Sequence, residues 1–82
     1  MKITLFTCSR IYDLYRAAGE LTLDKVYPVT ELIRDDYMII ASDSGRGFSI
    51  VPTADGKYVN GGEPFVEFTR SDIEIDEEQT NE

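Results

Sequence analysis

Short runs in which apolar and polar residues alternate recur along the chain, and this pattern predicts strands. The first such run is Lys2–Phe6, and a longer one is Val26–Ile33. Alternation places the apolar side chains of a strand on one face, where a core can cover them. Pro28 lies inside the second run and has no N–H to donate to a ladder, so we expect it at a strand edge or at a bulge.

One segment near the amino terminus has helical spacing instead. Between Ser9 and Gly19 the apolar residues recur at the spacing of a single helical face, and they are Ile11, Leu14, Tyr15 and Ala18. Ser9 is a suitable N-cap, and Gly19 suits the left-handed position after the last turn. A helix of about nine residues does not persist alone in water, so we expect it to pack on the sheet.

The middle of the chain predicts a hairpin. Tyr37–Ala41 is the most apolar run and should be a central strand, and Phe48–Val51 is its returning partner. The turn between them, Asp43–Gly47, contains glycines that adopt positive φ without strain. A short strand, Lys57–Val59, and a last core strand, Phe65–Phe68, follow. About five or six short strands with one short helix predict a mostly β member of the α+β class, either a small barrel or a rolled antiparallel sheet.

The acidic residues are concentrated at the carboxyl terminus. The chain has 82 residues with 16 acidic and 8 basic side chains, and its formal net charge is −8. Six of the acids and none of the bases lie in residues 71–82, so residues 1–70 carry ten acids and eight bases, a net charge of −2. We expect one small domain over residues 1–70 and an acidic tail over residues 71–82. Ile73 and Ile75 alternate with acids there and could extend the last strand.

The composition also excludes several kinds of chemistry. Histidine is absent, so the usual base at neutral pH and the commonest metal ligand are missing. The one cysteine, Cys8, can form neither an internal disulfide nor a thiolate cage for a metal, and we expect it to be a small core residue. We therefore expect no enzymatic activity, no cofactor and no metal site. No apolar run is long enough for a signal peptide or a membrane helix, so we expect a cytoplasmic protein without a membrane partner.

Several segments together resemble a known family. A strand with an aromatic residue and a proline, an apolar hairpin with an Asp-x-Gly turn, and a closing phenylalanine follow one another in the order Leu23–Val29, Asp36–Ile40, Asp43–Gly45, Phe48–Pro52 and Phe65–Phe68. This order resembles the small SH3-like barrel proteins that tailed bacteriophages and bacteria encode, over residues 21–68. Asp24 stands where that family has a glycine, and Thr53–Glu63 is an insertion. The resemblance implies an SH3-like barrel that recognises surfaces, and it implies no catalytic residue.

The candidate contact residues are tyrosines, one arginine and the acidic end. Tyrosine is enriched at protein interfaces because its ring is apolar and its tip is polar, and Tyr12 falls off the apolar face of the expected helix. The acidic end offers negative charge to a basic surface together with two isoleucines. The predicted protein-binding residues are Tyr12, Arg46, Tyr58, Asp72, Ile73, Glu74, Ile75, Asp76, Glu77 and Glu78.

These observations favour a non-catalytic protein-binding module. With the resemblance, they suggest a phage-type accessory protein in the host cytoplasm. Its partner would be a larger host protein with a basic surface that handles nucleic acid, such as a polymerase, a defence nuclease or a CRISPR effector, and binding would inhibit or redirect it. The acidic end would then occupy a groove as nucleic acid does. The alternative is a nucleic-acid-binding barrel in which Arg34, Arg46, Lys57 and exposed tyrosines form one positive face. Acidity makes direct nucleic-acid binding the weaker hypothesis, and the sequence leaves the oligomeric state open.

Overall fold

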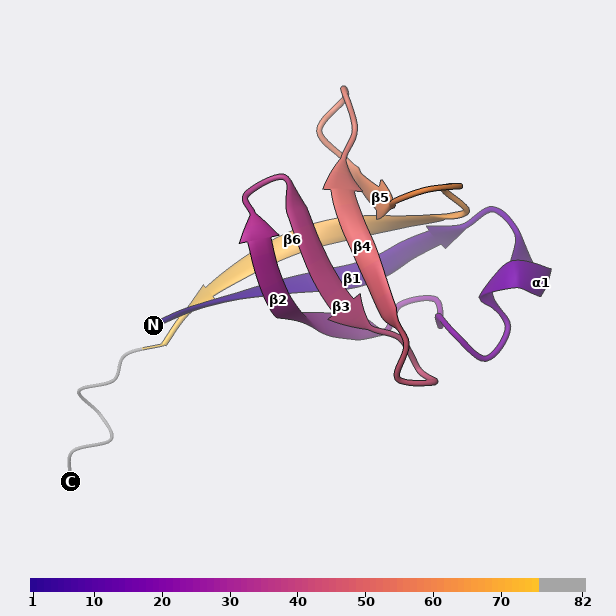
Figure 1. Ribbon diagram of the computed structural model, residues 1–82, viewed down its shortest axis with the longest axis horizontal. Helices are drawn as coiled ribbons and strands as arrows, with labels where there is room; N and C mark the ends of the chain where they lie inside the picture. Colours follow the sequence, from indigo (N-terminus) through magenta and orange to yellow (C-terminus); the bar gives the residue numbers. More distant parts are fainter. Residues whose placement is uncertain (76–82) are drawn as a thin grey trace.

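The computed structural model describes residues 1–75 and contains a closed antiparallel barrel of six strands in the order β1 to β6 (Figure 1). The elements are β1 (Lys2–Ile11), α1 (Leu14–Ala17), β2 (Val26–Arg34), β3 (Tyr37–Ala41), β4 (Gly47–Pro52), β5 (Tyr58–Asn60) and β6 (Val66–Glu74). The prediction of a small, mostly β domain with one short helix is confirmed, and the barrel is consistent with an SH3-like fold. β3 and β4 form the predicted hairpin.

The core fills the barrel with inward-facing residues from most of the strands. Its largest fully buried side chains come from the middle of β1, from the β3–β4 hairpin and from the start of β6, and they are Phe6, Cys8, Met38, Ile40, Ile50, Val66 and Phe68. Aromatic rings meet edge to face across this core, with 6.2 Å between the centroids of Phe6 and Phe68 and 6.5 Å between those of Tyr27 and Phe68. Edge-to-face pairs of this kind add to the stabilisation that burial provides.

Cys8 lies in this core, as expected. Its side chain has no exposed surface. Burial raises the pKa of the Cys8 thiol to about 11, and the negative charges of Asp24 and Asp43 add to that effect. The thiol is therefore protonated at neutral pH and packs as a small apolar group.

The prediction of a helix between Ser9 and Gly19 is wrong over the first half of that segment. β1 continues to Ile11, and Asp13 rather than Ser9 is the N-cap of a helix of 4 residues. Because β6 lies alongside, Cys8, Arg10 and Ile11 pair with it as strand. Ser9 lies at the register shift between Cys8 and Arg10, and its hydroxyl donates to the carbonyl of Glu67 at 3.1 Å. A long-range ladder thus overrides local helical spacing, a common outcome for short segments. Gly19 does take the left-handed conformation expected after the helix, with φ of 76°.

Pro28 lies where β2 changes partners. The pairing of β1 with β2 ends at Leu5 and Pro28, and the pairing of β2 with β3 begins at Val29. A register shift follows directly between Val29 and Glu31. The expectation that Pro28 lies at an edge or bulge is therefore consistent with the ladder.

The pairing of β1 with β6 extends further than that of any neighbouring pair. β1 pairs with β6 from Lys2 to Ile11, whereas it pairs with β2 only from Leu5 to Thr7. The segments Met1–Thr4 and Asp72–Ile75 therefore form a two-stranded ribbon that projects from the barrel, on the left in Figure 1. The helix α1 lies at the opposite end of an elongated molecule with extents of 48 × 27 × 19 Å.

Candidate functional site

A hydrogen-bond network around Asp43 fixes the loop that leads from α1 to β2. The Asp43 carboxylate accepts bonds from Lys25 Nζ at 2.5 Å, from Thr22 Oγ1 at 2.7 Å and from the Tyr27 hydroxyl at 3.0 Å. The bonds from Lys25 and Thr22 lower the pKa of Asp43 most, because they stabilise its ionised form. The α1–β2 loop is therefore attached to the β3–β4 turn.

A second carboxylate attaches the same loop from its other side. Glu20 Oε1 accepts bonds from the hydroxyls of Ser42 at 2.7 Å and Ser44 at 2.5 Å, and Glu20 Oε2 lies 3.3 Å from Arg46 Nη1. The two hydroxyls are the main reason that the pKa of Glu20 is lowered, and Arg46 adds to it. Arg46 is thereby oriented by a carboxylate that is itself held in place.

The helix α1 is anchored through one face and exposes the other. Ala17 is buried, its backbone carbonyl accepts from Leu21 N at 2.9 Å, and Leu21 is buried as well. The outward residues are far more exposed: Tyr12 by 57%, Leu14 by 74% and Tyr15 by 92%. We call these three residues the α1 patch; Tyr12 precedes the helix, and Leu14 and Tyr15 lie on it.

A groove lies beside α1. This groove has a volume of about 310 Å³ and its lining residues are Arg16, Ala18, Glu20, Arg46, Phe48 and Phe65. We call it the arginine groove. Arg16 belongs to α1, the same helix that carries Leu14 and Tyr15 of the α1 patch.

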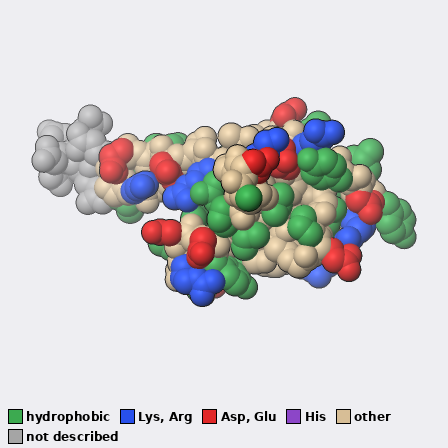
Figure 2. Space-filling model, turned by 90° about the horizontal axis from the view of Figure 1, so that it is seen from above, with side chains coloured by type: hydrophobic (Ala, Val, Ile, Leu, Met, Phe, Trp, Pro, Cys, Tyr) green, Lys and Arg blue, Asp and Glu red, His purple; other side chains and the backbone are tan. Residues whose placement is uncertain are grey.

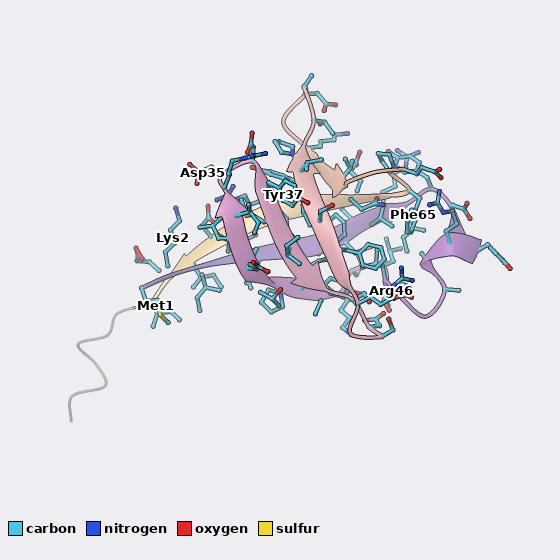
Figure 3. The ribbon with its side chains drawn as sticks, viewed as in Figure 1. Met1, Lys2, Asp35, Tyr37, Arg46 and Phe65 are labelled. Carbon is cyan, nitrogen blue, oxygen red and sulfur yellow. The ribbon has the colours of Figure 1, made fainter. Side chains whose placement is uncertain are left out.

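The two arginines of this groove each lie over a phenylalanine ring. The guanidinium carbon of Arg16 is 4.7 Å from the ring centroid of Phe65, and that of Arg46 is 5.8 Å from the centroid of Phe48. The two rings contact each other edge to face at 6.4 Å. Figure 3 labels Arg46 at the β3–β4 turn and Phe65 just before β6, both towards the end that carries α1. The arrangement offers apolar surface with cationic rims, which suits a protein side chain better than a reacting substrate.

The predicted contact residues lie in different parts of the structure. Tyr12 precedes α1 and its hydroxyl donates to Glu67 Oε2 at 3.1 Å, whereas Arg46 lies at the β3–β4 turn and lines the arginine groove. Tyr58 is half-buried in the barrel wall, where its ring lies 5.1 Å from that of Phe6 and its hydroxyl accepts from Arg70 Nη1 at 3.0 Å. Its contacts are thus already made within the molecule.

The predicted acidic segment begins on the projecting ribbon. Asp72, Ile73 and Glu74 belong to β6 and Ile75 follows it, whereas Asp76, Glu77 and Glu78 lie outside the described residues. Asp72 accepts bonds from Thr4 Oγ1 at 2.8 Å and from Arg70 Nε at 3.3 Å, and the Thr4 bond is the main cause of its lowered pKa. Four of the seven predicted acidic-end residues therefore have a defined backbone, at the opposite end from α1.

The basic side chains do not form one positive face. Within residues 1–75, six of the eight basic side chains make an ion pair with a carboxylate. Arg34, Arg46 and Lys57, which the nucleic-acid hypothesis requires together, pair with Asp36, Glu20 and Glu67 respectively. Acidic and basic side chains accordingly alternate on the face that Figure 2 shows. The paired carboxylates offset the charge of Arg34, Arg46 and Lys57.

Sequence reasoning missed most of the α1 end. Leu14 and Tyr15 were expected to pack on the sheet, and Arg16, Phe48 and Phe65 were not selected. The available signal was the mixture of large apolar residues with Asp13 and Arg16 in so short a segment. A single helical turn cannot bury an apolar face of four residues, so part of that face must remain outside.

Comparisons with known proteins add no relationship: no family model, no curated protein and no solved structure matches this chain. Among the residues that the structure describes, none of the helices is long and apolar enough to cross a membrane. Within the same residues, no group of three or more cysteine and carboxylate side chains is arranged to hold a metal ion.

Proposed function

We propose that the protein is a non-catalytic binding module that engages a partner protein through its α1 end. The observation that carries this proposal is the exposure of Leu14 and Tyr15, by 74% and 92%, on a helix whose position is fixed. Exposed apolar side chains cost solubility, so a rigidly presented set of them marks an interaction surface. Aromatic and arginine residues, which the α1 patch and the arginine groove combine, are the residue types that contribute most at protein interfaces.

The charge distribution supports a protein partner over nucleic acid. The three bases that a nucleic-acid face would need are each paired with a carboxylate. A phosphate backbone would have to displace those carboxylates and would meet their negative charge nearby. We therefore expect no binding of single-stranded DNA or RNA at physiological salt.

The finer proposal concerns the identity of the partner. We propose a host protein that handles nucleic acid and has a basic surface, and a phage-type origin for this chain. This part rests on the family resemblance of residues 21–68 and on the six acids of residues 71–82. Opposite charge on the two partners would accelerate association in a salt-dependent way.

The test compares the proteins that are captured from host lysate by the wild-type chain and by the double variant Leu14→Ser/Tyr15→Ser. The matched control is Leu32→Ser/Ile33→Ser, which also removes two exposed apolar side chains, 63% and 49% exposed, from β2. We expect the wild type and the control to retain the same protein after nuclease treatment, and the α1 variant to lose it. Because all four residues are exposed, all three chains should unfold at similar temperatures.

Two outcomes would contradict the proposal. Equal yields of the same partner with the α1 variant would show that the α1 patch is not the interface. Loss of the captured protein from the wild type on nuclease treatment would show that nucleic acid bridges the two, and it would favour the alternative hypothesis.

A further inference from the structure

Among residues 1–75, no strand pairs with the outer edge of β6 over its second half. β6 pairs with β1 along its whole length, but β5 pairs with it only at Glu67 and Phe68. Within residues 1–75, the segment Ser71–Glu74 therefore has β1 on one side and no strand on the other. An unpaired strand edge is a template for the addition of a further strand.

The register shows which backbone groups of β6 face this open edge. Met1 and Ile75 exchange both of their backbone hydrogen bonds, at 3.0 and 2.7 Å. Pairs in an antiparallel ladder alternate between this arrangement and one in which N–H and C=O point away from the partner strand. The next pair inward, Lys2 with Glu74, is thus of the second kind, and so is Thr4 with Asp72.

An independent contact agrees with this alternation. The pair of Cys8 with Phe68 lies an even number of residues along the ladder from the pair of Thr4 with Asp72, so both pairs should be of the same kind. The N–H and C=O of Cys8 do point away from β6, since they bond to Lys25 and Asp24. The N–H and C=O groups of Asp72 and Glu74 consequently face the open edge of β6. They are the groups with which an added strand would form its ladder.

The side chains along this edge alternate between isoleucine and acid. Ile73 and Ile75 lie on the same face of the ribbon as Ile3 and are 45% and 37% exposed. Asp72 and Glu74 lie on the other face. An incoming strand would therefore meet apolar side chains on one face. On the other face it would meet the carboxylates of Asp72 and Glu74, where Arg70 also bonds to Asp72 and Lys2 lies opposite Glu74.

We propose that the open edge of β6, over Ser71–Glu74, binds an extended segment of a partner protein in which lysine or arginine alternates with apolar residues. Its basic side chains lie opposite Asp72 and Glu74, and its apolar side chains cover Ile73 and Ile75. Opposite charges across a ladder are favourable and like charges are unfavourable. If two copies of this edge paired antiparallel around Ile73, Asp72 of each copy would face Glu74 of the other, and such like charges are unfavourable.

This inference rests on the proposed function only in that the ligand is a protein segment. It concerns the end of the molecule opposite the α1 patch and uses none of the same residues. Serine substitutions at Leu14 and Tyr15 should leave strand addition unchanged, so failure of either proposal leaves the other standing.

The experiment uses the full chain and a synthetic peptide of alternating lysine and valine. The control peptide has the same composition with its lysines and valines in two separate blocks. Amide hydrogen exchange is followed by NMR, because an amide that enters a ladder is protected. We expect saturating alternating peptide to slow exchange at Asp72 and Glu74 by about tenfold or more. The amide of Ile73, which faces β1, should change little, and the block peptide should protect none of them.

Variants separate the site from net charge. Glu74→Lys should weaken binding of the alternating peptide by about fivefold to tenfold, because the lysine replaces a charge opposite to that of the peptide by a like charge. Asp35→Lys makes the same change of charge at the β2–β3 turn and should have a much smaller effect. Glu74→Pro removes an N–H that faces the open edge and is not part of the β1 ladder. It should therefore weaken binding of the peptide while the barrel stays folded.

The proposal is overturned if the block peptide binds as tightly as the alternating peptide, or if Asp35→Lys and Glu74→Lys weaken binding equally. In either case net charge alone would explain the binding. Protection at Lys2 and Thr4 in place of Asp72 and Glu74 would assign the added strand to β1 and overturn it too. No binding by the wild type, together with self-association of Glu74→Lys, would mean that the carboxylates only guard the edge.

Discussion

The two ends of this barrel expose apolar surface in different ways. At the α1 end, single side chains project from a segment that is fixed by a buried Ala17, a buried Leu21 and the carboxylate networks of Glu20 and Asp43. At the ribbon end, the isoleucines lie on two strands that pair with each other and project from the barrel. The α1 end therefore exposes side chains, whereas the ribbon end exposes backbone groups of a strand edge. The first arrangement can select the shape of a partner surface, and the second can select an extended conformation.

The largest effect we expect concerns Cys8, which lies on β1 between the two ends. With no exposed surface and a thiol pKa of about 11, Cys8 should react with a thiol reagent only when the whole barrel opens. Its native labelling rate should be about a thousandfold or more below that of the urea-unfolded chain. Fast native labelling would mean that fraying of the ribbon reaches the middle of β1, and the two ends would then not be independent.

A pair of alanine substitutions should show how differently the two ends are packed. Phe65 is 6% exposed and supports Arg16, so Phe65→Ala should lower the free energy of unfolding by about 3 kcal/mol or more. Ile73 is 45% exposed, and Ile73→Ala should cost less than about 1 kcal/mol. Urea unfolding of both variants measures this, and similar losses would mean that the ribbon is a packed part of the core.

A smaller loss of stability should follow from substitution of Asn60, whose side chain bonds to the backbone that leads into β6. Asn60 Oδ1 accepts from the backbone N–H groups of Phe65 and Val66 at 2.9 and 3.0 Å, and Asn60 is buried. Asn60→Ala would leave these two N–H groups without an acceptor, at a cost of about 2 kcal/mol. If Asn60→Ala is as stable as wild type in urea, the amide does not position the chain that leads into β6.

Removal of residues 76–82 should affect binding and leave stability almost unchanged. This truncation keeps β6 complete and removes acids at 76, 77, 78 and 82. We expect about tenfold weaker binding to a basic partner at low salt and a shallower salt dependence. The serine variants of the α1 patch should weaken binding at every salt concentration equally. An unchanged affinity of the truncated chain at low salt would assign binding to the α1 end alone.

The smallest effect we expect is on the acid side of the stability profile. Because hydrogen bonds lower the pKa of Asp43 in the folded protein, the stabilisation from its ionised form is present above the ordinary aspartate pKa of about 4. It is lost as pH falls through the lower folded-state pKa. Asp43→Asn removes this titration, so its stability should depend less on pH below about 4 in urea unfolding at several pH values. An unaltered profile would mean that the network does not hold the α1–β2 loop.

Some of these features could be predicted from local sequence and others could not. The β3–β4 hairpin was predictable because Tyr37–Ala41, a glycine-containing turn and Phe48–Val51 are adjacent in the chain. The length of β1 was not, because its second half becomes a strand only through pairing with a segment more than fifty residues away. At the site, Tyr12 and Arg46 were selected from residue type, but Phe65 reaches the arginine groove through the folding of the Asn60–Phe65 loop.

The sequence alone determined the class of fold, the absence of histidine and the acidic carboxyl terminus, because alternation, composition and charge are properties of short stretches or of the whole chain. Tertiary structure decided which apolar residues remain outside. Tyr15 and Ala17 are two positions apart in the chain, yet one is 92% exposed and the other is buried. Periodicity states only that a face is apolar, whereas burial also requires an opposing surface large enough to cover it. Here the barrel covers Ala17 and Leu21, and it leaves Leu14, Tyr15, Ile73 and Ile75 exposed.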